Sequence, residues 1–246
     1  MREGIVTYAE REPVDAALAA KQHGAYVAAL AAAGWTVQEV EPADALPDSA
    51  FVEDTVVVCA DLAVLTRPGA VERQAEVSGT EDAVRALGLE VARIEEPGTL
   101  DGGDVLSVGN TLYAGRGGRT NEEGIRQLAE AVSSRGYEVV PVPLRNVLHL
   151  KSAVTALPDG ALITADPSSF DTEPFPLLRL VPEPAGSHVV PVGARTVLMA
   201  ASAPRSAELF SRLGFDVVAV DISEFEKLEG CVTCLSVRLR HSPPAP

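Results

Sequence analysis

Four side chains that together could carry out covalent catalysis lie at two repeated distances from glycine residues. Asp54 and Cys234 each follow a glycine by 20 residues, and Asp101 and His149 each follow one by 13 residues. The four glycines, in the same order, are Gly34, Gly214, Gly88 and Gly136. A cysteine becomes a nucleophile when a neighbouring base removes its proton, and an imidazole can be that base. These residue types predict a cysteine hydrolase with Cys234 as nucleophile and His149 as its proton-transfer partner.

The acidic residues of this set are open to two interpretations. Asp101 can orient the imidazole or bind the substrate, and Asp54, with the adjacent Glu53, supplies negative charge suited to a planar cation. Both aspartates can also be turn residues, and Asp101 is followed by two glycines, as in a turn. A histidine near its ordinary pKa can protonate a leaving amine and later activate water. The residue types therefore indicate a reaction class before they indicate a substrate.

Three cysteines, Cys59, Cys231 and Cys234, are too few for a disulfide framework. We therefore expect a reducing, cytoplasmic environment. Cys231 and Cys234 have C-x-x-C spacing, which also occurs in zinc sites and thioredoxin-like redox sites. A zinc site needs two further ligands, and the redox motif normally opens a helix, whereas the segment CLSVRL alternates like a strand. We interpret Cys59 as a buried strand residue and Cys231 as a loop thiol beside the nucleophile.

The glycines end helices that are each followed by a strand. The segments LAAAGWTVQEV, VRALGLEVARI, VSSRGYEVVPV and FSRLGFDVVAV share this pattern, and EPAGSHVVPV around Gly186 is a weaker copy. Glycine after the last helical turn takes up the left-handed conformation that ends a helix, and the valine-rich residues beyond it favour a strand. Between successive glycines, two short strands precede a helix. The predicted helices span about 13–33, 72–87, 121–134 and 204–213.

This repeat predicts a ring of about five β-β-α-β units, a five-bladed α/β propeller formed by one catalytic domain over residues 1–240. The segments GIVTYAE (4–10) and VTCLSVRL (232–239) are expected to be strands that pair with each other and complete the fifth unit. Closure of the ring removes open sheet edges. The residues that precede the first strand of each unit then face the axis of the ring. The side chains of Asp54, Asp101, His149 and Cys234 would therefore meet in one central pocket. The proline-rich residues 241–246 predict a disordered tail.

The composition limits the classes of partner. A formal net charge of −15 argues against a nucleic-acid-binding protein and is compatible with a small cationic substrate. Hydrophobic residues make up 46% of the chain, yet no apolar run approaches the length of a transmembrane helix. The first residues include acids and lack the apolar stretch of a signal peptide. We expect no nucleic-acid or membrane partner, and a monomer or homodimer.

At these residues the sequence resembles the dimethylarginine dimethylaminohydrolase family of the guanidino-group-modifying pentein superfamily. The matching segments run from about residue 46 to residue 237 and are LPDSAFVEDTVVVCADLAVLTRPGAVER, TLDGGDVL, GRTNEEG, LHLKSAVTALP and GCVTCLSV. The resemblance implies a five-bladed α/β propeller that hydrolyses methylated arginines to citrulline and a methylamine. It also implies that the reaction needs no metal and no organic cofactor.

The resemblance further implies roles for individual residues. Cys234 would attack the guanidinium carbon, His149 would act as general acid and then as general base on water, and Asp101 would complete the cysteine–histidine–acid set. The positions implied to bind substrate are Glu53 and Asp54 at the guanidinium, and Asp48, Arg73, Arg119, Leu228 and Glu229 at the amino-acid end. A guanidinium can pair with a carboxylate through two hydrogen bonds, which suits Arg73 and Arg119 to binding the carboxylate of an amino-acid substrate.

Two features depart from the patterns of relatives. Arginine deiminases of the same superfamily carry His-x-Asp where this chain has His149, Leu150 and Lys151, and loss of the second carboxylate leaves room for N-methyl groups. Glu229 and Cys231 replace an aspartate and an apolar residue of close relatives, which affects contacts to the substrate's amino end. Two other functions remain open: a hydrolase or deiminase of arginine or another guanidino compound, and a non-catalytic ligand-binding propeller.

Overall fold

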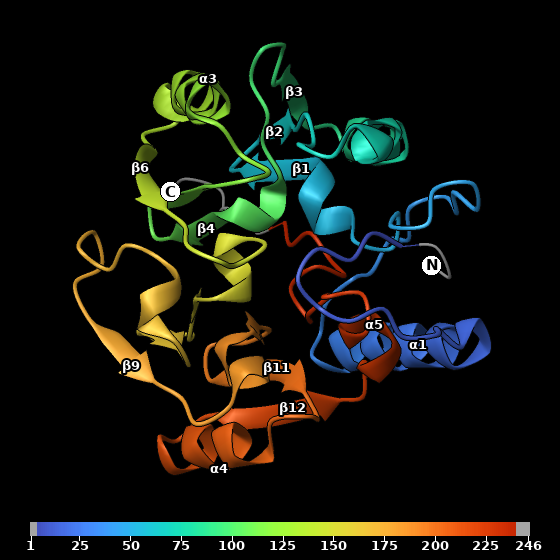
Figure 1. Cartoon of the computed structure of the whole chain (residues 1–246), viewed down its shortest axis with the longest axis vertical. Coiled ribbons are helices and arrows are strands. Elements are labelled where there is room, and N and C mark those ends of the chain that lie inside the picture. The colour runs from blue at the N-terminus through green and yellow to red at the C-terminus, as the bar shows by residue number, and fades with distance from the viewer. Residues whose placement is uncertain (1–3, 240–246) are drawn as a thin grey trace.

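The computed structural model describes residues 4–239 and, within them, four three-stranded sheets arranged round a common centre (Figure 1). In every sheet the first two strands are antiparallel and the third is parallel to the second. Figure 1 shows the third strands β3, β6, β9 and β12 on the outside of the ring, with α3 and α4 beyond them. The predicted tail, residues 241–246, lies outside the described residues.

The strands of the four sheets are short. The first two sheets contain β1 (Val56–Cys59), β2 (Leu62–Leu65), β3 (Glu90–Arg93), β4 (Val105–Val108), β5 (Thr111–Arg116) and β6 (Glu138–Pro143). The other two contain β7 (Thr155–Ala156), β8 (Leu162–Thr164), β9 (Leu178–Leu180), β10 (Val189–Pro191), β11 (Thr196–Ala200) and β12 (Asp216–Val220). The fully buried positions lie mainly on the inner strands, which explains their runs of valine and leucine.

Four long helices lie within the predicted ranges. They are α1 (Ala16–Ala32), α2 (Val77–Ala86), α3 (Glu122–Ser133) and α4 (Pro204–Arg212), and α5 (Ser223–Glu226) is a single turn. The glycines after the four long helices have the positive φ that the cap requires: 92° at Gly34, 78° at Gly88, 73° at Gly136 and 91° at Gly214. Of the helices in residues 4–239, none has the length and apolar character needed to cross a membrane.

The predicted boundary between the third and fourth units is wrong. Gly186 follows no α-helix but lies in the 3-10 helix Pro184–Ser187, which leads into β10, the first strand of the fourth sheet. The third sheet is completed instead by β9. Between β8 and β9 the chain has the 3-10 helix Pro167–Ser169 where the other sheets have an α-helix. The third unit therefore lacks the helix–glycine–strand pattern on which the prediction depended.

The predicted pairing of terminal strands is also wrong, because segments 4–10 and 232–239 contain no strand in the structure. Three consecutive backbone N–H groups, beginning at Thr7, instead donate to the carboxylate of Glu229 over 2.5, 2.8 and 3.1 Å. Backbone donors need a partner, and here a side chain supplies what a neighbouring strand would supply. The fifth unit thus contributes α1 and two irregular segments.

Helix α1 anchors the C-terminal segment that carries Cys234. The hydroxyl of buried Tyr26 donates to the carbonyl of Val232 at 2.9 Å and lies 2.7 Å from Ser236 Oγ. Tyr26, Leu30 and Cys234 belong to one buried apolar cluster. A buried hydroxyl that satisfies a loop carbonyl fixes the loop, because breaking the bond would leave both groups without a partner.

Candidate active site

Short 3-10 helices precede the first strand of each sheet and repeat one structural position. Those that concern the site span Val52–Thr55 before β1, Gly102–Asp104 before β4 and Leu150–Ser152 before β7. Asp54 lies within the first, and Asp101 and His149 directly precede the second and third. The distance of 13 residues that Asp101 and His149 share therefore corresponds to one structural position in two successive units. The distance of 20 residues that Asp54 and Cys234 share does not, because no strand follows Cys234 in the described residues.

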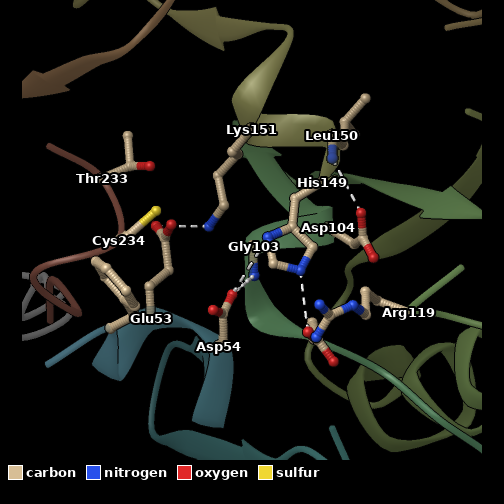
Figure 2. Close-up of polar contacts among 12 residues, drawn as sticks. Glu53, Asp54, Gly103, Asp104, Arg119, His149, Leu150, Lys151, Thr233 and Cys234 are labelled. Carbon is tan, nitrogen blue, oxygen red and sulfur yellow. Dashed lines mark hydrogen bonds and ion pairs between the residues drawn. The ribbon is translucent and has the colours of Figure 1, made fainter. Parts of the chain in front are cut away.

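His149 lies between two carboxylates (Figure 2). Its Nε2 is 2.9 Å from Asp101 Oδ2, and its Nδ1 is 3.7 Å from Asp54 Oδ1. The other oxygen of Asp101 accepts the backbone N–H of Gly69 at 2.8 Å. All three side chains of the histidine and its two acids are almost completely buried. The imidazole is thereby fixed in orientation, since each ring nitrogen faces its own acid.

These groups also set one another's charge. Burial by itself lowers the pKa of an imidazole, but Asp54 and Asp101 overcome this effect and raise the pKa of His149 to about 10. Burial likewise favours a neutral Asp54, yet His149 and Arg73 lower its pKa to about 2. At neutral pH the site therefore holds an imidazolium beside an ionised Asp54. An imidazolium is the form that can give a proton to a leaving amine.

Arg73 holds Asp54 from the other side. Its Nη1 lies 2.5 Å from Asp54 Oδ2, while its Nε and Nη2 donate to Glu76 at 3.0 and 2.7 Å. Nη2 also donates to the carbonyls of Asp48 and Phe51, both at 3.3 Å. All three guanidinium nitrogens are thus used within the protein. This pairing balances a charge that would otherwise be costly at a buried position.

Two consecutive glycines permit the close approach of these elements. A Cβ on Gly102 would lie 1.9 Å from the carbonyl oxygen of Glu53. A Cβ on Gly103 would lie 2.6 Å from Asp54 Oδ1 and 2.7 Å from His149 Nδ1. The backbone N–H of Gly103 also donates to Asp54 Oδ1 at 3.0 Å. The sequence predicts Gly102 and Gly103 only as turn residues and does not reveal the hydrogen bond from Gly103 to Asp54.

Cys234 reaches the same region from the loop after α5. The backbone carbonyl of Cys234 accepts the N–H of Glu53 at 3.2 Å, which ties the loop to the 3-10 helix before β1. The sulfur of Cys234 lies 3.3 Å from that of Cys231. The hydrogen bond with Cys231, burial, and the nearby charges of Glu53 and Asp54 hold the pKa of Cys234 well above its usual value. A cation bound beside this thiol would oppose the effect of the acids.

Glu53 and Lys151 form a second buried ion pair, which sequence reasoning missed. Lys151 Nζ is 2.7 Å from Glu53 Oε1. Within residues 4–239, the buried Oε2 of Glu53 has no hydrogen-bond partner. Burial raises the pKa of Glu53, and Lys151 opposes that rise. Figure 2 shows the Cys234 sulfur on the side of this carboxylate.

Three of the residues predicted to hold the amino-acid end, Asp48, Arg119 and Glu229, contact the N-terminal segment, whereas Arg73 pairs with Asp54 and Glu76. Asp48 accepts the backbone N–H of Ile5 at 3.0 Å, and Arg119 Nη2 donates to Thr7 Oγ1 at 3.1 Å. Glu229 has a φ of 60° and accepts the backbone donors of the same segment. The three hydrogen bonds place this carboxylate against residues 7–9, and Ile5 of the same segment lines the pocket.

These residues surround one pocket. The predicted residues that line it are Asp48, Asp54, Arg73, Arg119, His149, Leu228, Glu229 and Cys234. Asp101 and Glu53 do not line it: Asp101 is fully buried behind His149, and Glu53 is buried against Lys151. The lining residues that sequence reasoning missed are Ile5, Phe51, Leu148 and Gly230. They are apolar or small, and nothing in the sequence distinguishes them from core residues.

Asp54, Asp101 and His149 also have the donor types of a metal site, with one possible ligand atom from each within 4.8 Å of the others. A histidine binds a metal through the lone pair of one nitrogen, while the other nitrogen donates its proton. Here each ring nitrogen faces a carboxylate, and Asp54 is already paired with Arg73. The arrangement suits a charged imidazolium better than a metal ligand.

A ring of three-stranded sheets around a buried thiol, imidazole and acid pocket defines the pentein class of α/β propellers. No protein-family profile matches the chain. It is, however, 58% identical over 240 residues to N(G),N(G)-dimethylarginine dimethylaminohydrolase of Streptomyces coelicolor, a match that covers 98% of this chain and 93% of the relative. It is 37% identical over 228 residues to the enzyme of the same name from Pseudomonas aeruginosa, which covers 91% and 89% of the two chains.

A solved structure agrees with these sequence matches. The Pseudomonas aeruginosa enzyme, as a cysteine-to-serine mutant complexed with citrulline, superposes with a TM-score of 0.90 at 35% identity, covering 97% of this chain and 94% of the other. The chain therefore belongs to the dimethylarginine dimethylaminohydrolase family of the pentein superfamily.

Proposed function

We propose that this protein hydrolyses N-ω-methylated arginine to citrulline and a methylamine, with Cys234 as nucleophile. The observation that carries the proposal is a pocket lined by a thiol and by an imidazole held between two buried acids. Relatives that match almost the whole chain are dimethylarginine dimethylaminohydrolases, and one of them binds citrulline in its solved structure.

The acids of the pocket suit a guanidinium group. Asp54 is ionised and lines the pocket, and the buried Oε2 of the adjacent Glu53 has no hydrogen-bond partner among residues 4–239. A guanidinium presents planar N–H donors that match two carboxylates. We assign Asp54 the direct contact with the substrate's cation, while Glu53 supplies an acceptor and negative charge on the side of Cys234.

The other end of the substrate carries a carboxylate and an amine. Arg119 lines the pocket, and within the part of the chain that the structure describes its side chain makes one hydrogen bond, to the hydroxyl of Thr7. Most of its donors are therefore assigned to the substrate carboxylate. Arg73 also lines the pocket and adds positive charge there, although its nitrogens already hold Asp54 and Glu76. Asp48 and Glu229 supply acceptors for the amine, and Leu228 packs against the chain between the two ends.

Covalent catalysis then takes two half-reactions. The Cys234 thiolate forms a bond from sulfur to the guanidinium carbon, and the carbon–nitrogen bond to the methylated nitrogen breaks as His149 gives that nitrogen a proton. The products are a free methylamine and an S-alkylthiouronium on Cys234. Water next adds to the same carbon while His149 accepts its proton, and the carbon–sulfur bond breaks. Citrulline leaves and the thiolate is restored. Asp101 keeps the imidazole in place throughout.

A bound cation also adjusts both reacting groups. With the pocket free of substrate, the pKa of His149 is raised to about 10 by Asp54 and Asp101, against the effect of burial. Nearby acids also help to raise the pKa of Cys234. A guanidinium that pairs with Asp54 places positive charge beside both groups. Its field lowers both pKa values, so the thiolate forms next to its electrophile and the imidazolium becomes a better acid.

Lys151 bears on the choice between methylated and unmethylated arginine. It pairs with Glu53 at 2.7 Å, at the position two residues after His149 where the arginine deiminase pattern has an aspartate. A lysine there offers no second carboxylate to bind the unsubstituted nitrogens of arginine. We therefore propose that a methylated nitrogen, which needs fewer acceptors, is preferred.

Three further properties stay predictions from the sequence. A cytoplasmic location is supported by three cysteines that are all free thiols. A single catalytic domain over residues 1–240 and a monomeric or homodimeric state complete the proposal.

The test is citrulline release from asymmetric dimethylarginine, monomethylarginine and arginine, measured as kcat/KM for each. We expect the methylated substrates to exceed arginine by roughly tenfold or more, the scale on which a pocket distinguishes one methyl group. Faster turnover of arginine would favour the arginine hydrolase or deiminase. Absence of citrulline from all three, with binding retained, would favour a non-catalytic propeller.

A further inference from the structure

We propose that Cys231 and Cys234 form a site of reversible oxidation, at which a hydroperoxide joins the two sulfurs in a disulfide and so removes the nucleophile. The two Sγ atoms are 3.3 Å apart, and both residues are free thiols in this structure. The effect on turnover rests on the proposed function of Cys234. Formation of the disulfide does not, and it can be measured separately.

The backbone of the loop already suits a disulfide. The N–H of Cys234 donates to the carbonyl of Cys231 at 3.1 Å, which is the hydrogen bond of a four-residue turn. Such a turn holds its end Cα atoms within about 7 Å, and the Cα atoms of disulfides lie about 4.4–6.8 Å apart. The sulfurs face each other across the turn and need only come from 3.3 Å to bonding distance. Rotation of the two side chains is sufficient, so the loop need not unfold.

The two thiols differ in access and in acidity. Cys234 lines the pocket and Cys231 does not, so a small peroxide reaches Cys234 first. Cys231 lies 3.2 Å from Thr233 Oγ1, and its hydrogen bond with Cys234 lowers its pKa well below the usual value. An attacking sulfur must be a thiolate. Cys231 is therefore placed to act second, as the thiolate that resolves an oxidised Cys234.

The reaction balances with peroxide as the only oxidant. Cys234 first passes its proton to the Cys231 sulfur, with which it shares a hydrogen bond, and the Cys234 thiolate so formed attacks one oxygen of hydrogen peroxide. A sulfur–oxygen bond forms and the oxygen–oxygen bond breaks. The leaving hydroxide takes the proton from Cys231 and departs as water. Cys234 is now a sulfenic acid, oxidised by two electrons. The Cys231 thiolate then attacks the Cys234 sulfur, so that the disulfide forms and the sulfur–oxygen bond breaks. The oxygen leaves as hydroxide, which takes up a proton from the solvent. A dithiol reductant returns two electrons and restores both thiols.

The proposal distinguishes this chain from one with a single active-site thiol. A lone sulfenic acid continues to sulfinic acid when peroxide persists, and that product is not restored by dithiols. A second sulfur at 3.3 Å intercepts it. Cys231 would thus protect the nucleophile from irreversible damage while switching it off.

The test compares the wild type with Cys231→Ser and with Cys59→Ser. Cys59 is the matched control because it is a buried thiol outside the pocket. Each protein is treated with hydrogen peroxide in small excess, and its intact mass, its peptides and its citrulline release are recorded before and after dithiothreitol. We expect wild type and Cys59→Ser to lose two hydrogens in the peptide that holds residues 231–234, to lose activity in parallel, and to recover on reduction.

The activity of Cys231→Ser after treatment is compared with its own untreated activity. Under peroxide this variant should gain one to three oxygens on Cys234 without full recovery on reduction. The proposal is overturned if wild type gains the same oxygens as Cys231→Ser and recovers no better. If the protein releases no citrulline at all, the mass change still decides the proposal, whereas the proposed function alone would fail.

Discussion

The two sides of the pocket are built differently. The acid–base side is a network of ion pairs in which each charged group faces one of opposite charge. Its members are His149, Asp101, Asp54, Arg73 and Glu76. On the thiol side, Cys234 and Cys231 share a hydrogen bond, and the Oε2 atom of Glu53 is buried with no partner in the described residues.

This difference separates two tasks. A fully paired network resists change, so the acid–base side can present one imidazole orientation to every substrate. An unpartnered buried acceptor is costly to leave unsatisfied, so the thiol side favours the arrival of a donor cation. The acid–base side is thus preorganised, and under the proposed function a substrate cation would complete the thiol side.

The largest expected effect comes from removing the thiol. Cys234→Ser should lower kcat by about a thousandfold or more, because a hydroxyl is a far weaker nucleophile than a thiolate at neutral pH. Citrulline release measures it. Cys231→Ser is the matched control, since its sulfur lies only 3.3 Å away but outside the pocket lining. Equal loss in both variants would contradict the assignment of the nucleophile.

Breaking the acid–base network should have the largest effect on stability. Arg73→Met leaves Asp54 and Glu76 buried without their shared cation, and loss of one partner from a buried pair costs about 3–5 kcal/mol of unfolding free energy. Chemical unfolding of the variant beside wild type measures the change. Arg126→Met is the control, because within the described residues the exposed Arg126 pairs with Glu123 and Glu130 on α3, both of which are accessible to solvent. A similar loss of unfolding free energy in both variants would show that the buried ion pairs of Arg73 stabilise the protein no more than surface pairs do.

The pH dependence of stability tests the charge of His149. Burial opposes the imidazolium, but Asp54 and Asp101 raise its pKa to about 10 in the folded state, against an ordinary value of 6.5. The stabilisation is therefore complete below pH 6.5 and is lost as the pH rises through about 10. The unfolding free energy of wild type minus that of His149→Gln should follow this curve. A difference that falls away near pH 6.5 would mean that the acids do not hold the proton.

A smaller effect is expected on the thiol side from Lys151→Met. Burial raises the pKa of Glu53 and Lys151 opposes it, so the variant should let Glu53 take up a proton at higher pH. As the pH is lowered, kcat/KM of the variant should therefore begin to fall at a higher pH than kcat/KM of wild type. The change should appear more in KM than in kcat. Lys151→Arg, which keeps the charge, should restore the pH profile of kcat/KM. An unchanged profile in Lys151→Met would show that Glu53 does not contribute to cation binding.

The sequence predicted the frame of the fold through its glycine caps. Gly34, Gly88, Gly136 and Gly214 end helices as expected, because a left-handed cap leaves a clear residue signal. The third unit was misread because it has no α-helix and β7 has only two residues, which leaves no periodic pattern. The terminal segments were misread because a side chain, Glu229, satisfies their backbone donors.

The site was predictable in part for the same reason. Asp101 and His149 occupy equivalent positions directly before their 3-10 helices, so their shared distance from the caps carried real information. Asp54 also precedes a first strand but lies within its 3-10 helix. The pairing of Glu53 with Lys151 and the backbone donor at Gly103 could not be found that way. Both depend on how separate units approach across the centre of the ring, which no local pattern records.

The central claim is that the Cys234 sulfur bonds to a guanidinium carbon. S-methylthiocitrulline tests it in a His149→Gly variant, because methanethiol leaves without a proton from an imidazole, while hydrolysis of the adduct lacks its base. Acid quenching and peptide mass spectrometry should find the thiouronium adduct on Cys234. The same experiment on a variant that also carries Cys234→Ser should find none. An adduct on Cys231, or one that persists without Cys234, would contradict the account.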